Sequence, residues 1–222
     1  MIEYVRDGAV VRISLDDGGR NVLTPKSVAS LRSIIADAEA SNEVQAIILS
    51  GNNHALSVGL DTATVLSGDK TTERLLSDMS ETLTALYMGR LRSIVVTQGH
   101  ATAAGAMLLL VADVRIGVAP GGKIGLSEVS VGLAVPEATL QLLRDRLLPG
   151  QQFACAGLSK LYDYQQASEI GFLDHLVPCS SDAQALAARE AARLGALPEE
   201  AYLETKLSLR NRYAQLVNFS NH

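Results

Sequence analysis

A loop of small residues between a buried strand and an apolar helix constrains this chain more than any other feature. The run from Ser93 to Thr97 predicts a buried strand, Gln98-Gly99 ends it, and Ala103 to Ala112 is helix-forming and almost wholly apolar. The first N–H groups of a helix point outward with the positive end of its dipole, and small side chains let a ligand carbonyl approach them. The segment therefore predicts either an oxyanion-binding loop or merely tight packing of the helix on a sheet.

A second segment repeats this order and favours the oxyanion interpretation. After an apolar run that predicts a strand at residues 44–50, the chain passes through a loop containing Gly51 and Gly59 to a helix start at Asp61 or Thr62. Two such loops can direct two N–H donors at one oxygen. A lone carboxylate, Glu128, follows a later turn and supplies a single group that can carry a proton.

These motifs resemble those of the enoyl-CoA hydratase/isomerase (crotonase) superfamily. Leu56 to Asp61 resembles the family's Phe-Ser-Ala-Gly-Ala-Asp segment, and Gln98 to Met107 resembles its Asn-Gly-x-Ala-x-Gly-Gly-Gly-x-Glu loop. Three further segments resemble family motifs. Ala112 to Ile116 resembles Cys-Asp-x-Arg-Ile, Ile124 to Glu128 resembles Gly-x-x-Glu, and Ala167 to Asp174 resembles Ala-x-x-x-Gly-Leu-Val-Asp. The motifs follow one another in unbroken order over roughly residues 1–180, which is far more specific than a lone glycine pattern.

The resemblance implies a site for an acyl-CoA thioester. It assigns the oxyanion donors to the backbone N–H groups of Leu60 and Ala104, which would hold the thioester oxygen as it becomes an enolate. Losing one such donor costs roughly 3 kcal/mol in comparable enzymes. Because the donors are backbone groups, alanine in place of glycine at Ala104 narrows the hole without removing it. Gly105 belongs to the same loop and to the expected substrate pocket.

The informative departure from the family pattern is Met107. Hydratases carry a glutamate there, the first of two that position the water, and methionine has no usable proton. Glu128 matches the second glutamate. One carboxylate can remove a proton from C2 and return it at C4, whereas syn addition of water ordinarily needs two groups. We therefore prefer a Δ3,Δ2-enoyl-CoA isomerase over an enoyl-CoA hydratase, with a non-catalytic CoA-thioester-binding protein or assembly subunit as the alternative of another class.

Several polar residues allow more than one interpretation. Apolar Met107 should raise the pKa of Glu128 by desolvation, although a glutamate in this context can also be a cap or a surface carboxylate. Glu137 follows Pro136 and is either a second acid near the pocket or a first-turn carboxylate favoured by the helix dipole. His100 follows the strand end and is a candidate pocket residue, whereas His54 is best explained as an exposed loop histidine.

Composition excludes several functions. The chain of 222 residues is 47% apolar, enough for one substantial core. Its net charge of -5, its 4% aromatic content and the absence of tryptophan argue against a nucleic-acid partner. We expect no metal and no cofactor other than the coenzyme A of the substrate. Cys155 and Cys179 lack metal or redox spacing, and no membrane span or signal is seen, which predicts a cytoplasmic protein with reduced thiols.

The predicted elements alternate between strands and helices. Ile2 to Val5 and Val10 to Leu15 flank a hairpin turn, and Thr24-Pro25 starts a helix from about Lys26 to Ala40. Further strands are expected near residues 44–50, 93–97 and 114–118, and further helices near 71–90 and 104–112, which together indicate an α/β core with mainly parallel strands. The resemblance specifies a crotonase-like spiral of ββα units over residues 1–180 and a C-terminal helical region over 181–222.

The C-terminal region is expected to be helical and to contribute to a homotrimer or a hexamer, as it does in relatives. An amphipathic stretch is predicted from Glu199 to Leu216. Within it, Lys206 and Arg210 lie one turn apart, so they either face the phosphates of CoA or belong to a solvated helix face.

Overall fold

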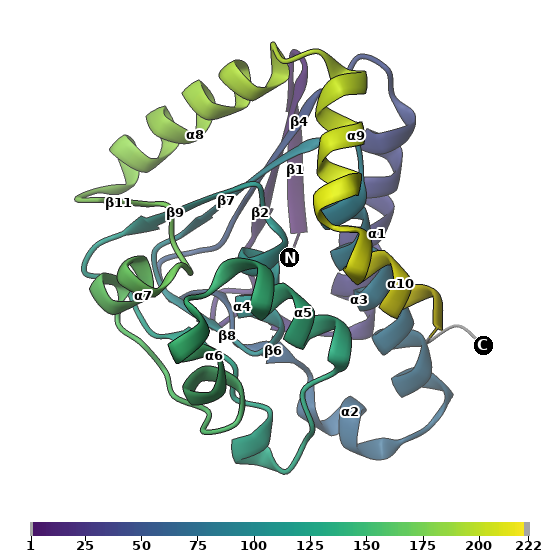
Figure 1. The fold of residues 1–222 in the computed structure, drawn as a ribbon, viewed down its shortest axis with the longest axis vertical. Helices are drawn as coiled ribbons and strands as arrows, with labels where there is room; N and C mark the ends of the chain where they lie inside the picture. The colour runs from purple at the N-terminus through teal and green to yellow at the C-terminus, as the bar shows by residue number, and fades with distance from the viewer. Residues whose placement is uncertain (1, 220–222) are drawn as a thin grey trace.

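The chain alternates between two parallel sheets and thereby forms a spiral (Figure 1). Three times in succession it passes through a strand of a six-stranded sheet, a strand of a three-stranded sheet and then one or more helices. The larger sheet has the order β1-β2-β4-β7-β9-β11 and the smaller one the order β10-β8-β5. The computed structural model describes residues 2–219, so Met1 and residues 220–222 of the predicted core and helical region lie outside the described residues. The predicted spiral of ββα units is confirmed.

The strands are short and pair in parallel except at the N-terminus. In the larger sheet they are β1 (Ile2–Asp7), β2 (Val10–Leu15), β4 (Ala46–Ser50), β7 (Arg92–Thr97), β9 (Val114–Val118) and β11 (His175–Val177). The smaller sheet contains β5 (Ala55–Ser57), β8 (His100–Thr102) and β10 (Ile124–Gly125), and β3 (Val22–Leu23) pairs with β6 (Gly59–Leu60). Only β1 and β2 pair antiparallel among the described strands, around the predicted turn at Gly8, whose φ is +59°.

Local sequence explains where the first long helix begins. Helix α1 (Pro25–Ala40) starts at the predicted place, because Thr24 accepts a hydrogen bond from Ser27 N–H while Ser27 Oγ accepts one from Thr24 N–H. Its apolar side chains repeat at helical spacing and all lie in the core: Val28, Leu31, Ile34, Ile35 and Ala38. Packing against α1 is α3 (Lys70–Met88), which follows the short α2 (Thr62–Ser67) that Asp61 caps.

The central strands of the larger sheet, β4, β7 and β9, are buried on both faces. Ile47, Leu49 and Val95 point to the main core, whereas alternate residues such as Ile48 and Ile94 pack against α8 (Ser180–Gly195). Helix α8 thus covers the face of the sheet opposite the other helices (Figure 1). Burial on both faces explains why these strands are continuous apolar runs rather than alternating patterns.

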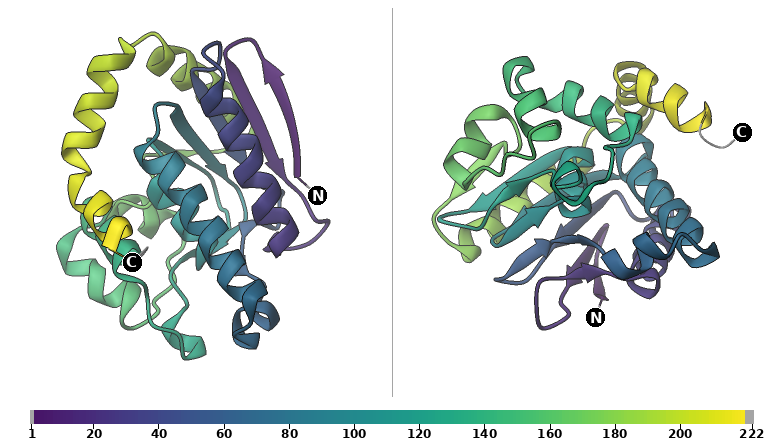
Figure 2. Two further views of the ribbon diagram at one scale, coloured as in Figure 1. Left: turned by 90° about the vertical axis from the view of Figure 1, so that its right-hand side faces the viewer. Right: turned by 90° about the horizontal axis from the view of Figure 1, so that it is seen from below.

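Helix α4 (Ala104–Val111) lies in the middle of the molecule, and every one of its residues is buried. It contacts β8 on one side and both α3 and α5 (Glu137–Arg146) on others. Its all-round apolar sequence is that of a helix with no solvent face. The views in Figure 2 show how the remaining helices enclose this centre.

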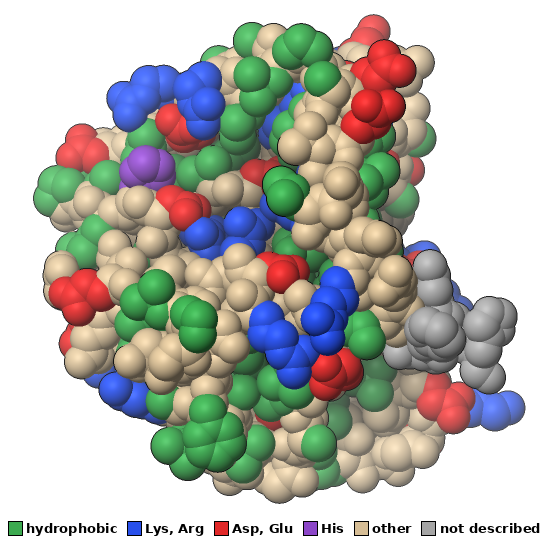
Figure 3. Space-filling view, in the orientation of Figure 1, with side chains coloured by type: hydrophobic (Ala, Val, Ile, Leu, Met, Phe, Trp, Pro, Cys, Tyr) green, Lys and Arg blue, Asp and Glu red, His purple; other side chains and the backbone are tan. Residues whose placement is uncertain are grey.

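Beyond α4 the chain forms a helical layer at one side of the spiral. The 3-10 turn η1 (Val129–Val131) precedes α5, and α6 (Pro149–Ala156) and α7 (Tyr164–Ile170) follow it. Hydrophobic side chains gather on the lower part of the face in Figure 3, over this layer. Several large apolar residues are exposed in it, namely Val131, Leu148, Phe153 and Leu158.

The C-terminal helices fold back onto the spiral instead of forming one long amphipathic helix. Helix α9 (Glu199–Leu209) ends at Arg210, and α10 (Asn211–Phe219) continues in a new direction (Figure 1). The residue of α9 that is buried is Lys206, which is 5% exposed.

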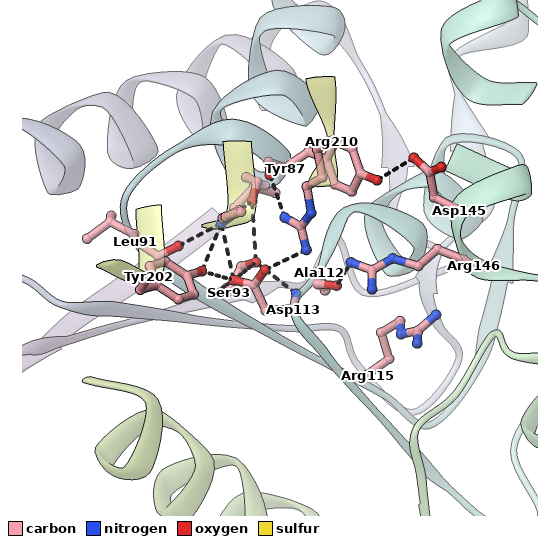
Figure 4. Close-up of polar contacts among 12 residues, drawn as sticks. Tyr87, Leu91, Ser93, Ala112, Asp113, Arg115, Asp145, Arg146, Tyr202 and Arg210 are labelled. Carbon is pink, nitrogen blue, oxygen red and sulfur yellow. Dashed lines mark hydrogen bonds and ion pairs between the residues drawn. The ribbon is translucent and has the colours of Figure 1, made fainter. Parts of the chain in front are cut away.

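Lys206 and Arg210 both bind Asp113, at the start of β9. Lys206 Nζ lies 3.3 Å from Asp113 Oδ2 and Arg210 Nη2 lies 2.9 Å from Oδ1 (Figure 4). Tyr202 Oη donates to the same carboxylate at 2.7 Å, and Ser93 N–H donates at 2.8 Å. The two expectations for Lys206 and Arg210 are therefore corrected: these cations neither form a solvated face nor point outward to a CoA phosphate, because a buried carboxylate holds them.

This cluster sets the protonation of its members. The cations Lys206 and Arg210, together with hydrogen bonds, hold the pKa of Asp113 below its ordinary value despite burial. Burial lowers the pKa of Lys206 to about 8, even though Asp113 opposes this effect.

Among residues 2–219, no helix is both long enough and apolar enough to span a membrane.

Asp113→Asn should strongly destabilise the protein. The substitution leaves two buried cations without a counter-charge, which typically costs 3–5 kcal/mol, so we expect a loss of about 3 kcal/mol in the free energy of unfolding in urea. Glu43→Gln is the matched control, because it breaks an ion pair to Arg6 in which both side chains are exposed, and such pairs contribute about 0–1 kcal/mol. An equal effect of the two variants would contradict the anchoring role of Asp113.

Candidate functional site

The two small-residue loops of the sequence touch each other. A Cβ added at Gly59 would lie 2.9 Å from the Cβ of Ala103, and one added at Gly105 would lie 2.1 Å from the carbonyl oxygen of Ser57. Gly59 also has φ of +111°, which L side chains rarely adopt. Glycine is thus required at both positions by the close approach of the loops.

The second loop, at Ala103, determines the backbone conformation at the start of α4. Ala103 is the N-cap with φ of +50° and ψ of -124°, a strained conformation for a residue with a Cβ, and its own N–H donates to Gly125 O at 3.0 Å. Ala104 is the first helical residue, so its N–H lies outside the intrahelical ladder of hydrogen bonds. An outward N–H is thereby available at the position that the sequence predicts.

The first loop presents Leu60 in a short strand. β6 pairs with β3 in the register Leu23↔Leu60, and Asp61 N–H donates to Leu23 O at 2.9 Å. Because successive N–H groups of an extended strand point to opposite sides, Leu60 N–H points away from β3. Leu60 and Ala104 thus lie in two loops in direct contact, at Gly59 and Ala103.

Glu128 is the carboxylate that the sequence predicts for this site. It follows β10, at the N-cap position of η1, and is 9% exposed. Within the described residues its Oε2 atom is buried and has no hydrogen-bond partner. Burial raises the pKa of Glu128, although backbone N–H groups of Glu128 and Ser127 oppose this effect. A buried carboxyl oxygen without a partner is expensive to maintain and therefore points to a function.

Met107 lies one turn into α4 and is also buried. Its sulfur is 3.6 Å from Oγ1 of Thr139, in the first turn of α5. Thr139 was not singled out in the sequence, where nothing in the local pattern marks a threonine within a helix as a neighbour of Met107.

Glu137 and His100 are the other two residues that the sequence predicts for the substrate pocket. Glu137 begins α5, is exposed and forms an ion pair with Arg144 at 2.6 Å. His100 is half-buried, accepts a hydrogen bond from Lys123 N–H and lines a polar hollow of about 270 Å³ together with His54 and Arg20. Among residues 2–219 no group of three His, Cys, Asp or Glu is placed to hold a metal ion.

A second, apolar hollow includes Val129, the residue after Glu128, in its lining. It measures about 430 Å³ and is lined mainly by residues of η1, α5 and α6, including Val129, Val135, Leu140, Phe153 and Ala156. Burial raises the pKa of the Cys155 thiol, in α6, to about 11, and the negative charge of Glu128 adds to this effect. Sequence reasoning missed this hollow, because its walls come from helices that only the fold brings together.

Ala103→Gly should stabilise the protein. Glycine adopts the observed φ and ψ without strain, and relief of strain worth about 1–3 kcal/mol outweighs an entropy penalty of about 0.5–1 kcal/mol, so we expect a net gain of about 1 kcal/mol. The control is Ala106→Gly in the same loop-helix segment, which should lose about 1 kcal/mol because a helix interior favours alanine. Urea unfolding of both variants measures the difference, and a loss in both would contradict strain at Ala103.

The sequence matches the family model described as enoyl-CoA hydratase/isomerase over residues 6–216. The peroxisomal fatty acid beta-oxidation multifunctional protein AIM1 of Arabidopsis thaliana is 28% identical over 180 residues, which are 80% of this chain and 25% of that protein. The chain thus spans about a quarter of that relative.

Solved structures agree over nearly the whole chain. The enoyl-CoA hydratase EchA3 of Mycobacterium ulcerans is 30% identical with a TM-score of 0.90, covering 98% of this chain and 94% of that one. An enoyl-CoA isomerase of Mycobacterium tuberculosis is 27% identical with a TM-score of 0.89, covering 98% and 94%.

Proposed function

Because the chain belongs to the enoyl-CoA hydratase/isomerase family, we propose that this acyl-CoA enzyme of the crotonase superfamily works as a Δ3,Δ2-enoyl-CoA isomerase. The observation that carries the proposal is the buried carboxyl group of Glu128, whose pKa is raised and whose Oε2 atom has no hydrogen-bond partner among residues 2–219. Met107 occupies the position at which a hydratase would need its other glutamate. A base that works alone suits a proton shift better than an addition of water.

In the proposed mechanism Glu128 moves one proton. Its carboxylate removes a proton from C2 of a 3-enoyl-CoA, and the electron pair passes to the thioester oxygen to form a dienolate. The N–H groups of Leu60 and Ala104 stabilise the negative charge on that oxygen. The protonated Glu128 then returns the proton to C4 as the charge collapses, which leaves the double bond between C2 and C3. No water is gained or lost.

The raised pKa suits both halves of this cycle. A carboxyl group whose pKa lies closer to neutrality is a stronger base in the first step and still a competent acid in the second. The apolar hollow, whose lining includes Val129 next to Glu128 in the chain, offers space for the acyl chain.

Hydration is the second candidate, because the similar structures include proteins described as enoyl-CoA hydratases. Glu137 would have to supply the second group, but its ion pair with Arg144 occupies its carboxylate. A protein that binds CoA thioesters without turning them over remains the alternative of another class. The homotrimer or hexamer and the cytoplasmic location stay predictions.

Glu128→Gln should abolish turnover. We expect the wild-type protein to convert 3-enoyl-CoA into a conjugated 2-enoyl-CoA of the same mass, followed by absorbance and mass spectrometry, and the variant to lose at least about 1,000-fold in kcat, since its amide accepts no proton in this role. Glu190→Gln is the matched control: Glu190 is also 9% exposed but pairs with Arg193 on α8.

The same assay discriminates the alternatives. A product heavier by one water would assign a hydratase, and its loss in Glu137→Gln would identify the second acid. Binding of thioester without either product would support the non-catalytic alternative. Full activity of Glu128→Gln would refute the proposed mechanism.

Glu128→Gln should also stabilise the folded protein near neutral pH. Since the folded state raises the pKa of Glu128, it binds more protons than the unfolded state, and the free energy of unfolding falls as pH rises through the raised value. A neutral amide avoids this loss, so we expect the free energy of unfolding of the variant to exceed that of the wild-type protein by about 1 kcal/mol near pH 7. The difference should vanish below about pH 4, where the wild-type carboxyl group is protonated in both the folded and the unfolded state. Urea unfolding at the two pH values measures it; a gain equal at both would exclude titration as its cause.

A further inference from the structure

The far end of α4 is held by one arginine. Arg146 Nε donates to Leu110 O at 3.0 Å and its Nη2 donates to Ala112 O at 2.7 Å (Figure 4). The last carbonyls of a helix have no partner within it, and a cation there complements the negative end of the dipole. Because every residue of α4 is buried, a side chain takes the place that water fills at an exposed helix end.

Arg146 is itself fixed by its neighbours. Its guanidinium lies 5.8 Å from the ring centroid of Tyr87, at the end of α3, and that of Arg210 lies 4.2 Å from the same ring. Tyr87 Oη donates to Asp145, the residue before Arg146, at 2.7 Å. Burial and the neighbouring Arg115 and Arg210 lower the pKa of Arg146 to about 10, which still leaves it a cation at neutral pH.

Helix α5 therefore contacts α4 at two points. Arg146 binds the C-terminal carbonyls, and Thr139 contacts Met107, one turn into the helix. Two contacts from one rigid neighbour fix both the position of α4 along its axis and its rotation. The helix is only about 12 Å long at 1.5 Å per residue, so a shift at one end is transmitted to the other.

We propose that Arg146 is a positioning residue for the reaction: it holds the C-terminal end of α4 so that Ala104 N–H, at the other end, is aligned with the thioester oxygen. The inference rests on the proposed function. Arg146 touches no reacting atom, and its effect passes through the helix. Small misplacements of such donors cost rate, because they act only when they point at the oxygen where charge develops.

The structure offers a matched control for a purely stabilising role. Arg90 binds the C-terminal end of α1 in the same manner, donating to Glu39 O at 2.9 Å and to Ser41 O at 2.7 Å. Helix α1 carries neither of the proposed donors. Arg90→Met and Arg146→Met thus both remove hydrogen bonds to a helix end, although Arg90 also pairs with Glu39 and Glu199, and only Arg146→Met should affect the site.

The test combines kinetics with a spectroscopic signature. Hexanoyl-CoA labelled with carbon-13 at its thioester carbonyl is bound to each variant, and infrared spectroscopy measures how far binding lowers the carbonyl stretching frequency. This shift reports the hydrogen bonds to the oxygen without any turnover. The assay with 3-enoyl-CoA supplies kcat and KM, and urea unfolding supplies stability.

We expect Arg146→Met to lose most of the frequency shift and about 10- to 100-fold in kcat with KM nearly unchanged. Arg146→Lys, which keeps the cation but not the two-pronged geometry, should be intermediate. Arg90→Met should lose stability alone. If Arg146→Met does not fold, Arg146→Lys decides the question by the same readouts.

Each other outcome is informative. If a folded Arg146 variant shows the same carbonyl frequency shift and the same kcat as Arg90→Met, the positioning role is refuted. The proposed isomerase activity is not affected by that result. If the wild-type protein has no turnover but shows a shift that Arg146→Met loses, the isomerase fails and the positioning role stands. If binding causes no shift in the wild-type protein, or if the thioester does not bind, the positioning role fails.

Discussion

A helix that is buried along its whole length must find partners inside the protein for the polar groups at both of its ends, and α4 imposes this requirement here. At the C-terminal end, Arg146 donates hydrogen bonds to the free carbonyl groups, and Arg146 in turn packs against Tyr87. The N-terminal end lies in the loop that begins at Ala103 and leaves Ala104 N–H outside the helix ladder. The same constraint that organises the core thus leaves free the N–H group that we propose as an oxyanion donor.

The burial of α4 also explains the position of the C-terminal helices. Its connection to β9 contains Asp113, whose carboxylate would be unpaired in the interior without Lys206 and Arg210. Arg210, the C-cap of α9, also donates a hydrogen bond to Tyr87 O, so the same side chain joins the end of α9 to α3. The segment after residue 197 is therefore part of the packing around the centre of the molecule.

Local patterns predicted the longer strands and the helices α1, α3 and α4, but not the short strands of the smaller sheet or the helices α5, α6 and α7. The capping residues Thr24 and Pro25 place the start of α1, and the apolar run after Arg92 places β7, because these signals depend on neighbours in the chain. The inward direction of Lys206 was not predictable, since Asp113 is 93 residues away in the sequence and a lysine on a helix ordinarily faces solvent. The apolar hollow and the Thr139–Met107 contact were not predictable for the same reason, because each involves helices that only tertiary packing brings together.

The contact between Gly105 and the carbonyl of Ser57 has a consequence for how such a protein can evolve. Donors made of backbone are inherited with the shape of the chain, and a substitution elsewhere in the loops leaves them in place as long as the two glycines persist. In the proposed mechanism, the choice of reaction then depends on a few side chains around these backbone donors, such as those at positions 107 and 128. Divergence in chemistry within one fold requires few mutations when the part that stabilises charge is encoded by geometry and the part that moves protons is encoded by side chains.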